Sequence, residues 1–279
     1  MIQIGLTGWS YHDSIPSNAK NKLRDYAAHF PIVELDSSFY AIPSEKNILN
    51  WIEETPDSFQ FIPKAYGPLT QHARRPEETK AIEELFNIFQ NRFQPMMDSG
   101  KLKTFLFQFP PYFSCVKENV QYLREVRYLM DDLPIAIEFR HPSWYSDDYQ
   151  KETLNLLKRL SFIQVVVDQP QTPNNSVPFV PIATHPDQAF IRLHGRNYQG
   201  WLGLDDTKDW RTFRTLYDYP ENELAEIKQA ALNLAQQAKD VIVIFNNNSG
   251  GHAAPNAKKF QQMLDIDYEG LAPRQLDLF

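Results

Sequence analysis

The chain has 279 residues, of which 42% are hydrophobic and 23% are charged, a composition typical of a globular protein and unlike that of a disordered, collagen-like or coiled-coil chain. One α/β barrel of roughly 250 residues accounts for this length, so a second domain is not required. The net charge of −7 excludes a protein that coats nucleic acid or an anionic membrane by general electrostatic attraction, and an anionic ligand must therefore meet a local group of cations.

The first residues run directly into an apolar strand pattern with no basic leader, and no stretch is apolar over the length of a membrane span. The single cysteine, Cys115, excludes an internal disulfide and fits a reducing compartment. We therefore expect a cytoplasmic protein with no membrane contact.

Short runs rich in β-branched and aromatic residues alternate along the chain with longer segments of helical spacing. The short runs predict eight strands, over residues 2–7, 32–35, 59–62, 104–107, 135–139, 162–167, 189–193 and 241–245. The longer segments predict helices over residues 44–54, 77–92, 117–130, 149–160, 221–239 and 255–264. Ser44 is placed to cap the first turn of its helix.

This alternation predicts a single TIM-type (β/α)₈ barrel over residues 1–270, followed by a tail over residues 271–279. An open, doubly wound sheet would show the same alternation. The turn after the first strand, Gly5 to Tyr11, lacks the complete G-x-G-x-x-G pattern, so a dinucleotide site has little support.

Polar and aromatic side chains follow the predicted strands at their carboxyl ends, which form the functional face of such a barrel. In chain order, the candidate site residues are Trp9, Glu34, Lys64, Gln108, Glu138, Arg140, His141, Asp168, Arg192, His194, Arg196, Asn246 and Asn247.

Alternation along a strand places Glu138 with Arg140, and Arg192 with His194, because side chains two residues apart share a face. If both pairs point into the barrel mouth, Arg140 and Arg192, with Arg196 and Lys64, create a cationic floor inside an acidic protein. A guanidinium can hold phosphate or carboxylate through two parallel hydrogen bonds. We therefore expect an anionic ligand, specifically a phosphate-bearing small molecule or a nucleic-acid fragment.

The acidic residues and the histidine have more than one role open to them. Glu34, Glu138 and Asp168 can serve as proton acceptors or as oxygen ligands of a divalent metal ion, and His194 can be a nitrogen ligand or a general acid. Residue spacing does not distinguish these roles. A purely structural alternative is an ion network of Glu138, Arg140, Arg192 and Asp168 that closes the top of the barrel.

Three functions follow from these residues. The first is an enzyme acting on a phosphate-containing, nucleic-acid-related substrate, such as a phosphate-ester hydrolase. The second is a sugar or sugar-phosphate isomerase or hydrolase, which uses Glu34, Glu138 and Asp168 for proton transfer or metal binding. The third is a non-catalytic ligand-binding protein.

A series of short motifs covers nearly the whole chain. The motifs are Gly8-Trp9-Ser10-Tyr11, Val33-Glu34, Phe39-Tyr40-Ala41-Ile42-Pro43, Phe59 to Lys64, Phe107 to Pro111, Ile137 to Trp144, Val167-Asp168, Arg192-Leu193-His194-Gly195-Arg196 and Phe245-Asn246-Asn247. In these motifs the chain resembles the domain of unknown function 72, also called the YecE-like family. The resemblance implies a TIM-type barrel with the matching polar residues at its mouth, and it implies no particular activity. The chain departs from the family at His12-Asp13-Ser14, in the loop after the first strand.

The last five residues form a separate motif: Gln275, Leu276, Asp277, Leu278 and Phe279. They resemble the pentapeptide by which bacterial replication and repair proteins bind the DNA sliding clamp. An extended peptide of this kind inserts its Leu and Phe side chains into apolar pockets while Gln forms an orienting hydrogen bond. The alternative is a hydrophobic tail that packs on its own barrel or on a second copy of the chain.

Overall fold

The computed structural model describes residues 1–10, 12, 14–15, 22–72, 79–173, 176–203 and 210–273. Its eight strands are all parallel and follow one another around a barrel in the order β3-β2-β1-β8-β7-β6-β5-β4. The strands are β1 (Ile2–Thr7), β2 (Ile32–Leu35), β3 (Gln60–Pro63), β4 (Phe105–Gln108), β5 (Ile135–Glu138), β6 (Ile163–Asp168), β7 (Gln188–Leu193) and β8 (Asp240–Phe245). The predicted (β/α)₈ barrel is confirmed, and the open doubly wound sheet is excluded.

Closure of the barrel is weakest at two places. Strands β3 and β4 are joined by isolated bridges, Phe61 to Leu102 and Lys64 to Leu106. Strands β5 and β6 pair over two positions, Ala136 with Ile163 and Ile137 with Gln164, and then separate toward their carboxyl ends. By contrast, β7 and β8 pair along their whole length.

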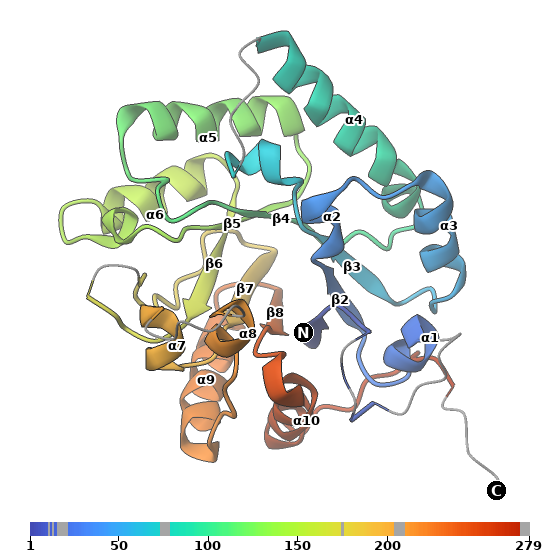
Figure 1. Cartoon of the computed structure of the whole chain (residues 1–279). Coiled ribbons are helices and arrows are strands. Elements are labelled where there is room, and N and C mark those ends of the chain that lie inside the picture. The colour runs from blue at the N-terminus through green and yellow to red at the C-terminus, as the bar shows by residue number, and fades with distance from the viewer. Residues whose placement is uncertain are drawn as a thin grey trace, which may run out of the picture.

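The helices surround the strands (Figure 1). They are α1 (Lys22–Ala27), α2 (Ser37–Tyr40), α3 (Glu45–Glu53), α4 (Thr79–Asp98), α5 (Lys117–Met130), α6 (Gln150–Arg159), α7 (Tyr198–Leu202), α8 (Trp210–Arg214), α9 (Glu221–Leu234) and α10 (Ala253–Met263). Three 3₁₀ helices lie after strand ends: η1 (Gly67–Thr70), η2 (Pro142–Tyr145) and η3 (Ser249–Gly251). The Ser44 cap of α3 is confirmed, because its side chain accepts a hydrogen bond from the backbone of Asn47 at 3.2 Å.

Burial on both faces explains why the strands read as continuous apolar runs. Strands β2, β5 and β6 are buried at every position. Parallel strands need this, because helices cover their outer face and the other strands cover their inner face. The charged residues at or next to the ends of these strands, Glu34, Glu138 and Asp168, are therefore buried.

Helix α4 extends beyond its predicted end. The sequence pattern ends this helix at Arg92, whereas the structure continues it through Pro95 to Asp98. Buried aromatic rings explain the difference: Phe89 and Phe93 lie 5.2 and 5.7 Å from the ring of Phe105 on β4. This packing outweighs the loss of one backbone hydrogen bond at proline. The predicted start at Glu77 lies outside the described residues.

The carboxyl end of α9 also differs from the prediction. Helix α9 ends at Leu234 rather than at Lys239, because Lys239 donates its backbone N–H to Pro186 and leads into β8. The short helices α1, α2, α7 and α8 have no counterpart in the prediction. In the described part of the chain, no helix has the length and apolar character needed to cross a bilayer.

The beginning of the predicted tail lies against the barrel. The backbone N–H of Ala272 donates to the carbonyl of Ala27 at the end of α1, and Ala272 is buried. The carbonyl of Gly270 accepts a hydrogen bond from Ser58 at 2.9 Å. The pentapeptide Gln275 to Phe279 lies outside the described residues.

Candidate functional site

Three charged side chains meet inside the barrel near the carboxyl ends of the strands. Arg192 of β7 donates from Nε and Nη2 to the two carboxylate oxygens of Glu34, at 2.8 and 2.6 Å. Its Nη1 donates to Oε2 of Glu138 at 2.5 Å. Because β7 is a neighbour of neither β2 nor β5 in the sheet, these bonds cross the interior. We call these three buried residues the Arg192 cluster.

Within the Arg192 cluster, Arg192 and Glu138 stabilise each other's charge, whereas at Glu34 burial outweighs the attraction of Arg192 and raises the pKa of the carboxyl. Burial disfavours the charge of Arg192, but Glu138 and Glu34 outweigh burial and raise the pKa of its guanidinium. Burial likewise disfavours the charge of Glu138, but the positive charges around it, chiefly Arg192 and also Arg140, hold the pKa of that carboxyl well below its ordinary value. Glu138 is therefore ionised at neutral pH.

His194 lies beside Glu138 and is neutral. Burial and the charge of Arg140 lower the pKa of His194 from 6.5 to about 3. Its Nδ1 accepts a hydrogen bond from Nδ2 of Asn246 at 2.8 Å, so the ring proton is on Nε2. Nε2 is 3.2 Å from Oε1 of Glu138 but outside hydrogen-bond geometry, and both atoms are buried with no hydrogen-bond partner. Oε1 of Glu138 thus has two close nitrogen neighbours, Nη1 of Arg140 at 3.1 Å and Nε2 of His194 at 3.2 Å, but neither contact has the alignment of a good hydrogen bond.

Arg140 connects this pair to the next side of the barrel. Its Nη1 lies 3.1 Å from Oε1 of Glu138 and donates to Oε1 of Gln169 at 3.2 Å. Gln169 follows β6, and Arg140 therefore links the residues that follow β5 and β6. Its other guanidinium N–H groups have no acceptor among the described residues.

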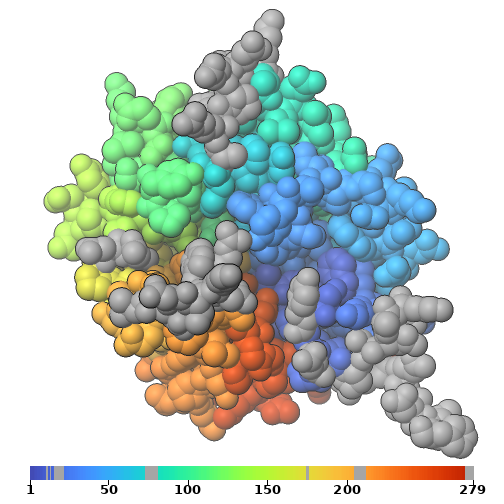
Figure 2. Space-filling model, in the orientation of Figure 1, coloured from blue at the N-terminus to red at the C-terminus, as the bar shows by residue number. Residues whose placement is uncertain are grey.

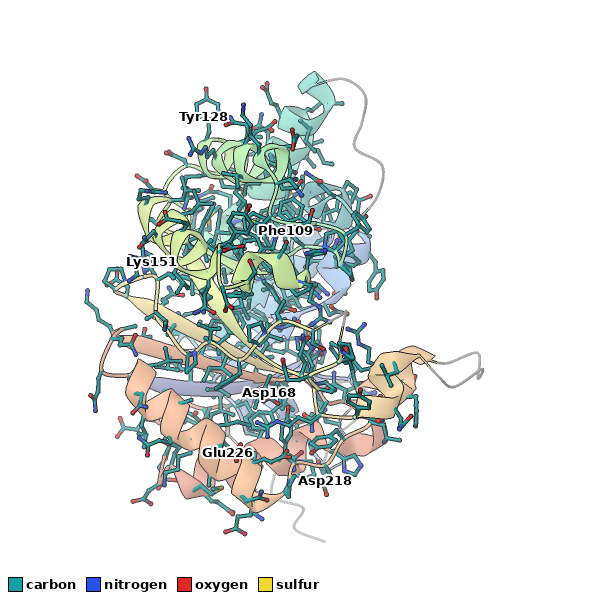
Figure 3. The ribbon with its side chains drawn as sticks, turned by 90° about the vertical axis from the view of Figure 1, so that its left-hand side faces the viewer. Phe109, Tyr128, Lys151, Asp168, Asp218 and Glu226 are labelled. Carbon is teal, nitrogen blue, oxygen red and sulfur yellow. The ribbon has the colours of Figure 1, made fainter. Side chains whose placement is uncertain are left out.

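Asp168 belongs to a second, separate cluster. Its oxygens accept from Nε and Nη2 of Arg196, at 3.0 and 2.8 Å, and from the hydroxyl of Tyr219 at 2.6 Å. Gly195 makes this turn possible, since its φ is +83° and a Cβ there would lie 2.6 Å from the Cβ of Tyr217. Figure 3 shows Asp168 among the strands. We call Asp168, Arg196 and Tyr219 the Asp168 cluster; it fastens β6 to the turn after β7.

Lys64 is paired on the opposite side of the mouth. Its ammonium group lies 2.8 Å from Asp36 and 4.6 Å from the ring centre of Phe39. The same ring meets His72 edge-on at 4.8 Å. Burial, together with the charges of Lys64 and Arg140, lowers the pKa of His72 to about 4. This imidazole is therefore also neutral at neutral pH.

The remaining predicted residues have local roles or lie at the edge of the site. Gln108 is in register with Glu138 on the neighbouring strand. Trp9 packs edge-on against Trp51 of α3. His141 accepts a hydrogen bond from the backbone of Ser143 at the start of η2. Asn247 is fully buried and donates to the carbonyl of Tyr217 and to Asn256 of α10.

Trp201 and Arg214 were missed by the sequence analysis. The guanidinium carbon of Arg214 is 3.5 Å from the ring centre of Trp201, and that of Arg140 is 5.1 Å from it. Trp201 is on α7 and Arg214 on α8, two short helices in the connection between β7 and α9. This connection is long for a compact barrel, and that length is the signal that could have drawn attention to it.

Metal binding does not fit the residues at the mouth. Glu34 uses both oxygens, and Glu138 one, to accept hydrogen bonds from Arg192, so a divalent ion between them would face a guanidinium. No group of three or more His, Cys, Asp or Glu residues suitable for a metal ion occurs in the described ranges. At the mouth of the barrel, Glu34 and Glu138 are therefore paired with Arg192 rather than placed to bind a metal ion.

The model of the family described as "Protein of unknown function DUF72" matches residues 3–277. The chain belongs to the DUF72 family. It is 51% identical to the UPF0759 protein YunF of Bacillus subtilis over the full length of both chains. It is also similar to the crystal structure of a DUF72 protein from Enterococcus faecalis, with a TM-score of 0.93, 42% identity, and coverage of 99% of this chain and 100% of that one.

A more distant likeness supports the fold of this DUF72 protein. The structure of D-psicose 3-epimerase from Clostridium cellulolyticum, with D-tagatose, matches with a TM-score of 0.56, covering 94% of this chain and 98% of the epimerase. The two are 10% identical, so the likeness concerns the barrel architecture.

Proposed function

We propose that this DUF72 protein is an enzyme that binds a phosphate-containing substrate at the carboxyl face of its barrel and transfers a substrate proton to Glu138, with His194 as a hydrogen-bond donor to the reacting oxygen. One observation carries the proposal: the ionised Oε1 of Glu138 and the protonated Nε2 of neutral His194 lie 3.2 Å apart and buried, and neither makes a hydrogen bond of good geometry. Buried polar groups without partners are uncommon in folded proteins, and each costs about 1–3 kcal/mol. A substrate hydroxyl group would satisfy both, by donating to Oε1 of Glu138 and accepting from Nε2 of His194.

The two groups suit complementary tasks. Glu138 is a carboxylate acceptor for a substrate proton, and its basicity increases when Arg140 turns toward an anionic ligand. Neutral His194 is a hydrogen-bond donor that can stabilise negative charge developing on a substrate oxygen. Arg192, Glu34 and Asn246 are positioning residues, since they hold Glu138 and His194 rather than facing the ligand.

The choice of a phosphate-containing ligand is supported by Arg140. Three cations of the mouth, Lys64, Arg192 and Arg196, are each paired with carboxylates at 2.8 Å or less. Arg140 retains free N–H groups next to the proposed proton-transfer pair. This arrangement favours phosphate-ester hydrolysis or isomerisation of a phosphorylated substrate over the metal-dependent sugar chemistry, for which the carboxylates are not free.

The test is a turnover screen against a panel of sugar phosphates, nucleotides and short oligonucleotides. Turnover of a hit should fall by at least about 100-fold in Glu138→Gln and in His194→Gln, as expected when a proton-transfer group is removed. Glu125→Gln, on the outer helix α5, is the matched control for the first variant. Binding of a hit without any turnover by the wild type would instead indicate a ligand-binding protein.

The tail supports a further part of this proposal, recruitment to the DNA sliding clamp. The support is the sequence of Gln275 to Phe279 alone. Because the chain is acidic, recruitment rather than intrinsic affinity would bring it to DNA. Capture by immobilised, purified clamp should be lost when Leu278 and Phe279 are both replaced by Ala. Equal capture of this double variant and the wild type would contradict recruitment through the tail.

A further inference from the structure

Two guanidinium groups lie against one indole ring on the carboxyl face, those of Arg140 and Arg214 on Trp201. Stacking uses the flat face of a guanidinium and leaves the N–H groups along its edge available to an acceptor. Trp201 itself is buried, with 7% of its surface exposed. Both cations therefore lie beside the same ring, close enough that the charge of Arg140 lowers the pKa of Arg214.

Arg214 has no counter-ion in the described part of the chain. It forms no ion pair with a carboxylate there, and its buried Nε has no hydrogen-bond partner. Burial and the nearby charge of Arg140 lower the pKa of Arg214 to about 9, so the group is charged at neutral pH at a cost in free energy. A negatively charged hydrogen-bond acceptor beside Arg214 would offset this cost.

The position of Arg214 is fixed by contacts between α7 and α8. Asn197, which caps α7, accepts from the backbone of Gly200 at 3.1 Å and donates to the carbonyls of Phe213 and Leu216, at 2.8 and 3.1 Å. Gly200 allows the two helices to approach, because a Cβ there would lie 2.7 Å from the carbonyl oxygen of Phe213. Arg214 is therefore oriented by the fold, and Figure 2 shows the face on which these segments lie.

We propose that Arg140 and Arg214 together bind a terminal phosphate group, that is, a phosphomonoester, with Trp201 as the apolar surface that holds both. The inference rests on the proposed function for the presence of a phosphate-bearing ligand, and it adds which residues hold the phosphate and which phosphate class they select. A phosphomonoester carries almost two negative charges and three terminal oxygens, enough for two guanidinium forks. A phosphodiester or a carboxylate has one charge and two such oxygens, so it engages one fork.

The test is calorimetric titration of the full chain with phenyl phosphate, and separately with diphenyl phosphate and with benzoate. Phenyl phosphate should bind at least about 10-fold more tightly than either monoanion, equivalent to about 1.4 kcal/mol. Equal affinity for phenyl phosphate and benzoate would overturn the assignment to a phosphomonoester. Absence of phenyl phosphate binding by the wild type at millimolar concentration would overturn the inference altogether.

Variants of the pair locate the binding site. Arg214→Gln should weaken phenyl phosphate binding by at least about 10-fold, and Arg214→Lys, which keeps the charge but loses the fork, should give an intermediate loss. Arg124→Gln, an exposed arginine on α5, makes the same change in charge and should bind as the wild type does. Thermal unfolding checks that each variant is folded. Binding to Arg214→Gln within about twofold of the wild type would overturn the inference.

Failure of this inference can be told apart from failure of the proposed function. If Glu138→Gln abolishes turnover while Arg214→Gln binds phenyl phosphate normally, the phosphate is held elsewhere and the proposed function stands. If Arg214→Gln loses binding but no substrate is turned over, the phosphate site stands and the proposed enzyme activity fails.

Discussion

At the amino end of the barrel, Lys103 donates to Asp240 at 2.7 Å, and buried Lys101 donates to the carbonyls of Ile52 and Thr55, both at 2.7 Å. At the carboxyl end, the Arg192 cluster is equally well paired, but Oε1 of Glu138 and Nε2 of His194 make no hydrogen bond of good geometry, although Nη1 of Arg140 lies 3.1 Å from that oxygen. At the amino end, the ammonium groups of Lys101 and Lys103 therefore join neighbouring segments of the barrel. Buried oxygens without a hydrogen-bond partner occur at the amino end too, on Gln3, Thr104 and Gln188, but they belong to neutral side chains. At the carboxyl end the corresponding oxygen belongs to an ionised carboxylate, which is expected where a ligand completes the site.

The largest expected difference between the two ends concerns loss of a cation. Arg192→Met leaves Glu34 and Glu138 buried without their common partner, which should lower the free energy of unfolding by at least about 3–5 kcal/mol. Lys103→Met leaves Asp240, which is 35% exposed and keeps the N-terminal amine 3.5 Å away, so about 1 kcal/mol is expected. Urea denaturation measures both. Equal losses would break the comparison, because they would mean that Arg192 is not the partner of two buried charges.

A smaller effect is expected from glycines at the two ends. Gly195→Ala adds a Cβ 2.6 Å from Tyr217 at a φ of +83°, and should cost about 2–3 kcal/mol while loosening the Asp168 cluster. Gly100→Ala, before β4, has a φ of +70° but nothing within 4 Å of the new Cβ, and should cost about 1 kcal/mol. Urea denaturation separates the clash from the backbone strain. A larger loss for Gly100→Ala would contradict this account of the turn after β7.

An effect of similar size, about 2 kcal/mol between pH 7 and 5, concerns pH. The pKa of His194 is about 3 in the folded chain against 6.5 when exposed, so below pH 6.5 the unfolded chain takes up a proton that the folded chain does not. The stability that the neutral imidazole contributes is complete above pH 6.5 and is lost as pH falls toward 3, by about 1 kcal/mol for each pH unit. His194→Gln should flatten the dependence of unfolding free energy on pH between 7 and 5. An unchanged slope would show that His194 is not buried in its neutral form.

Much of the fold could be predicted from local sequence. Apolar runs of four to six residues locate the strands, and alternation along β5 and β7 places Glu138 with Arg140 and Arg192 with His194. These are properties of short segments, so the sequence carries them directly. Helix α4 is the exception, since its passage through Pro95 depends on aromatic contacts with β4.

The pairing of charges in the candidate site was predicted only in part. The ion-network alternative joined Glu138 to Arg140 and Arg192, which do pair, but it also included Asp168, which pairs with Arg196 instead. Arg192 was expected to face a ligand, but it uses its donors on Glu34 and Glu138, and this depends on the distance across a closed barrel. Arg214 and Trp201 were not predicted as site residues, because α7 and α8 are too short to give a periodic pattern. Side chains at strand ends follow from sequence, whereas the partners that they meet across the barrel follow from tertiary structure.

The central claim is that Glu138 and His194 face the ligand under Arg140. The most direct measurement is the nitrogen-15 NMR spectrum of the histidine rings during titration with phenyl phosphate, with His185, in the segment before β7 at the amino end, as the internal control. The account predicts a neutral His194 protonated on Nε2 at pH 7, whose resonances shift on titration while those of His185 do not. Phosphate binding that leaves the His194 resonances unchanged would contradict it.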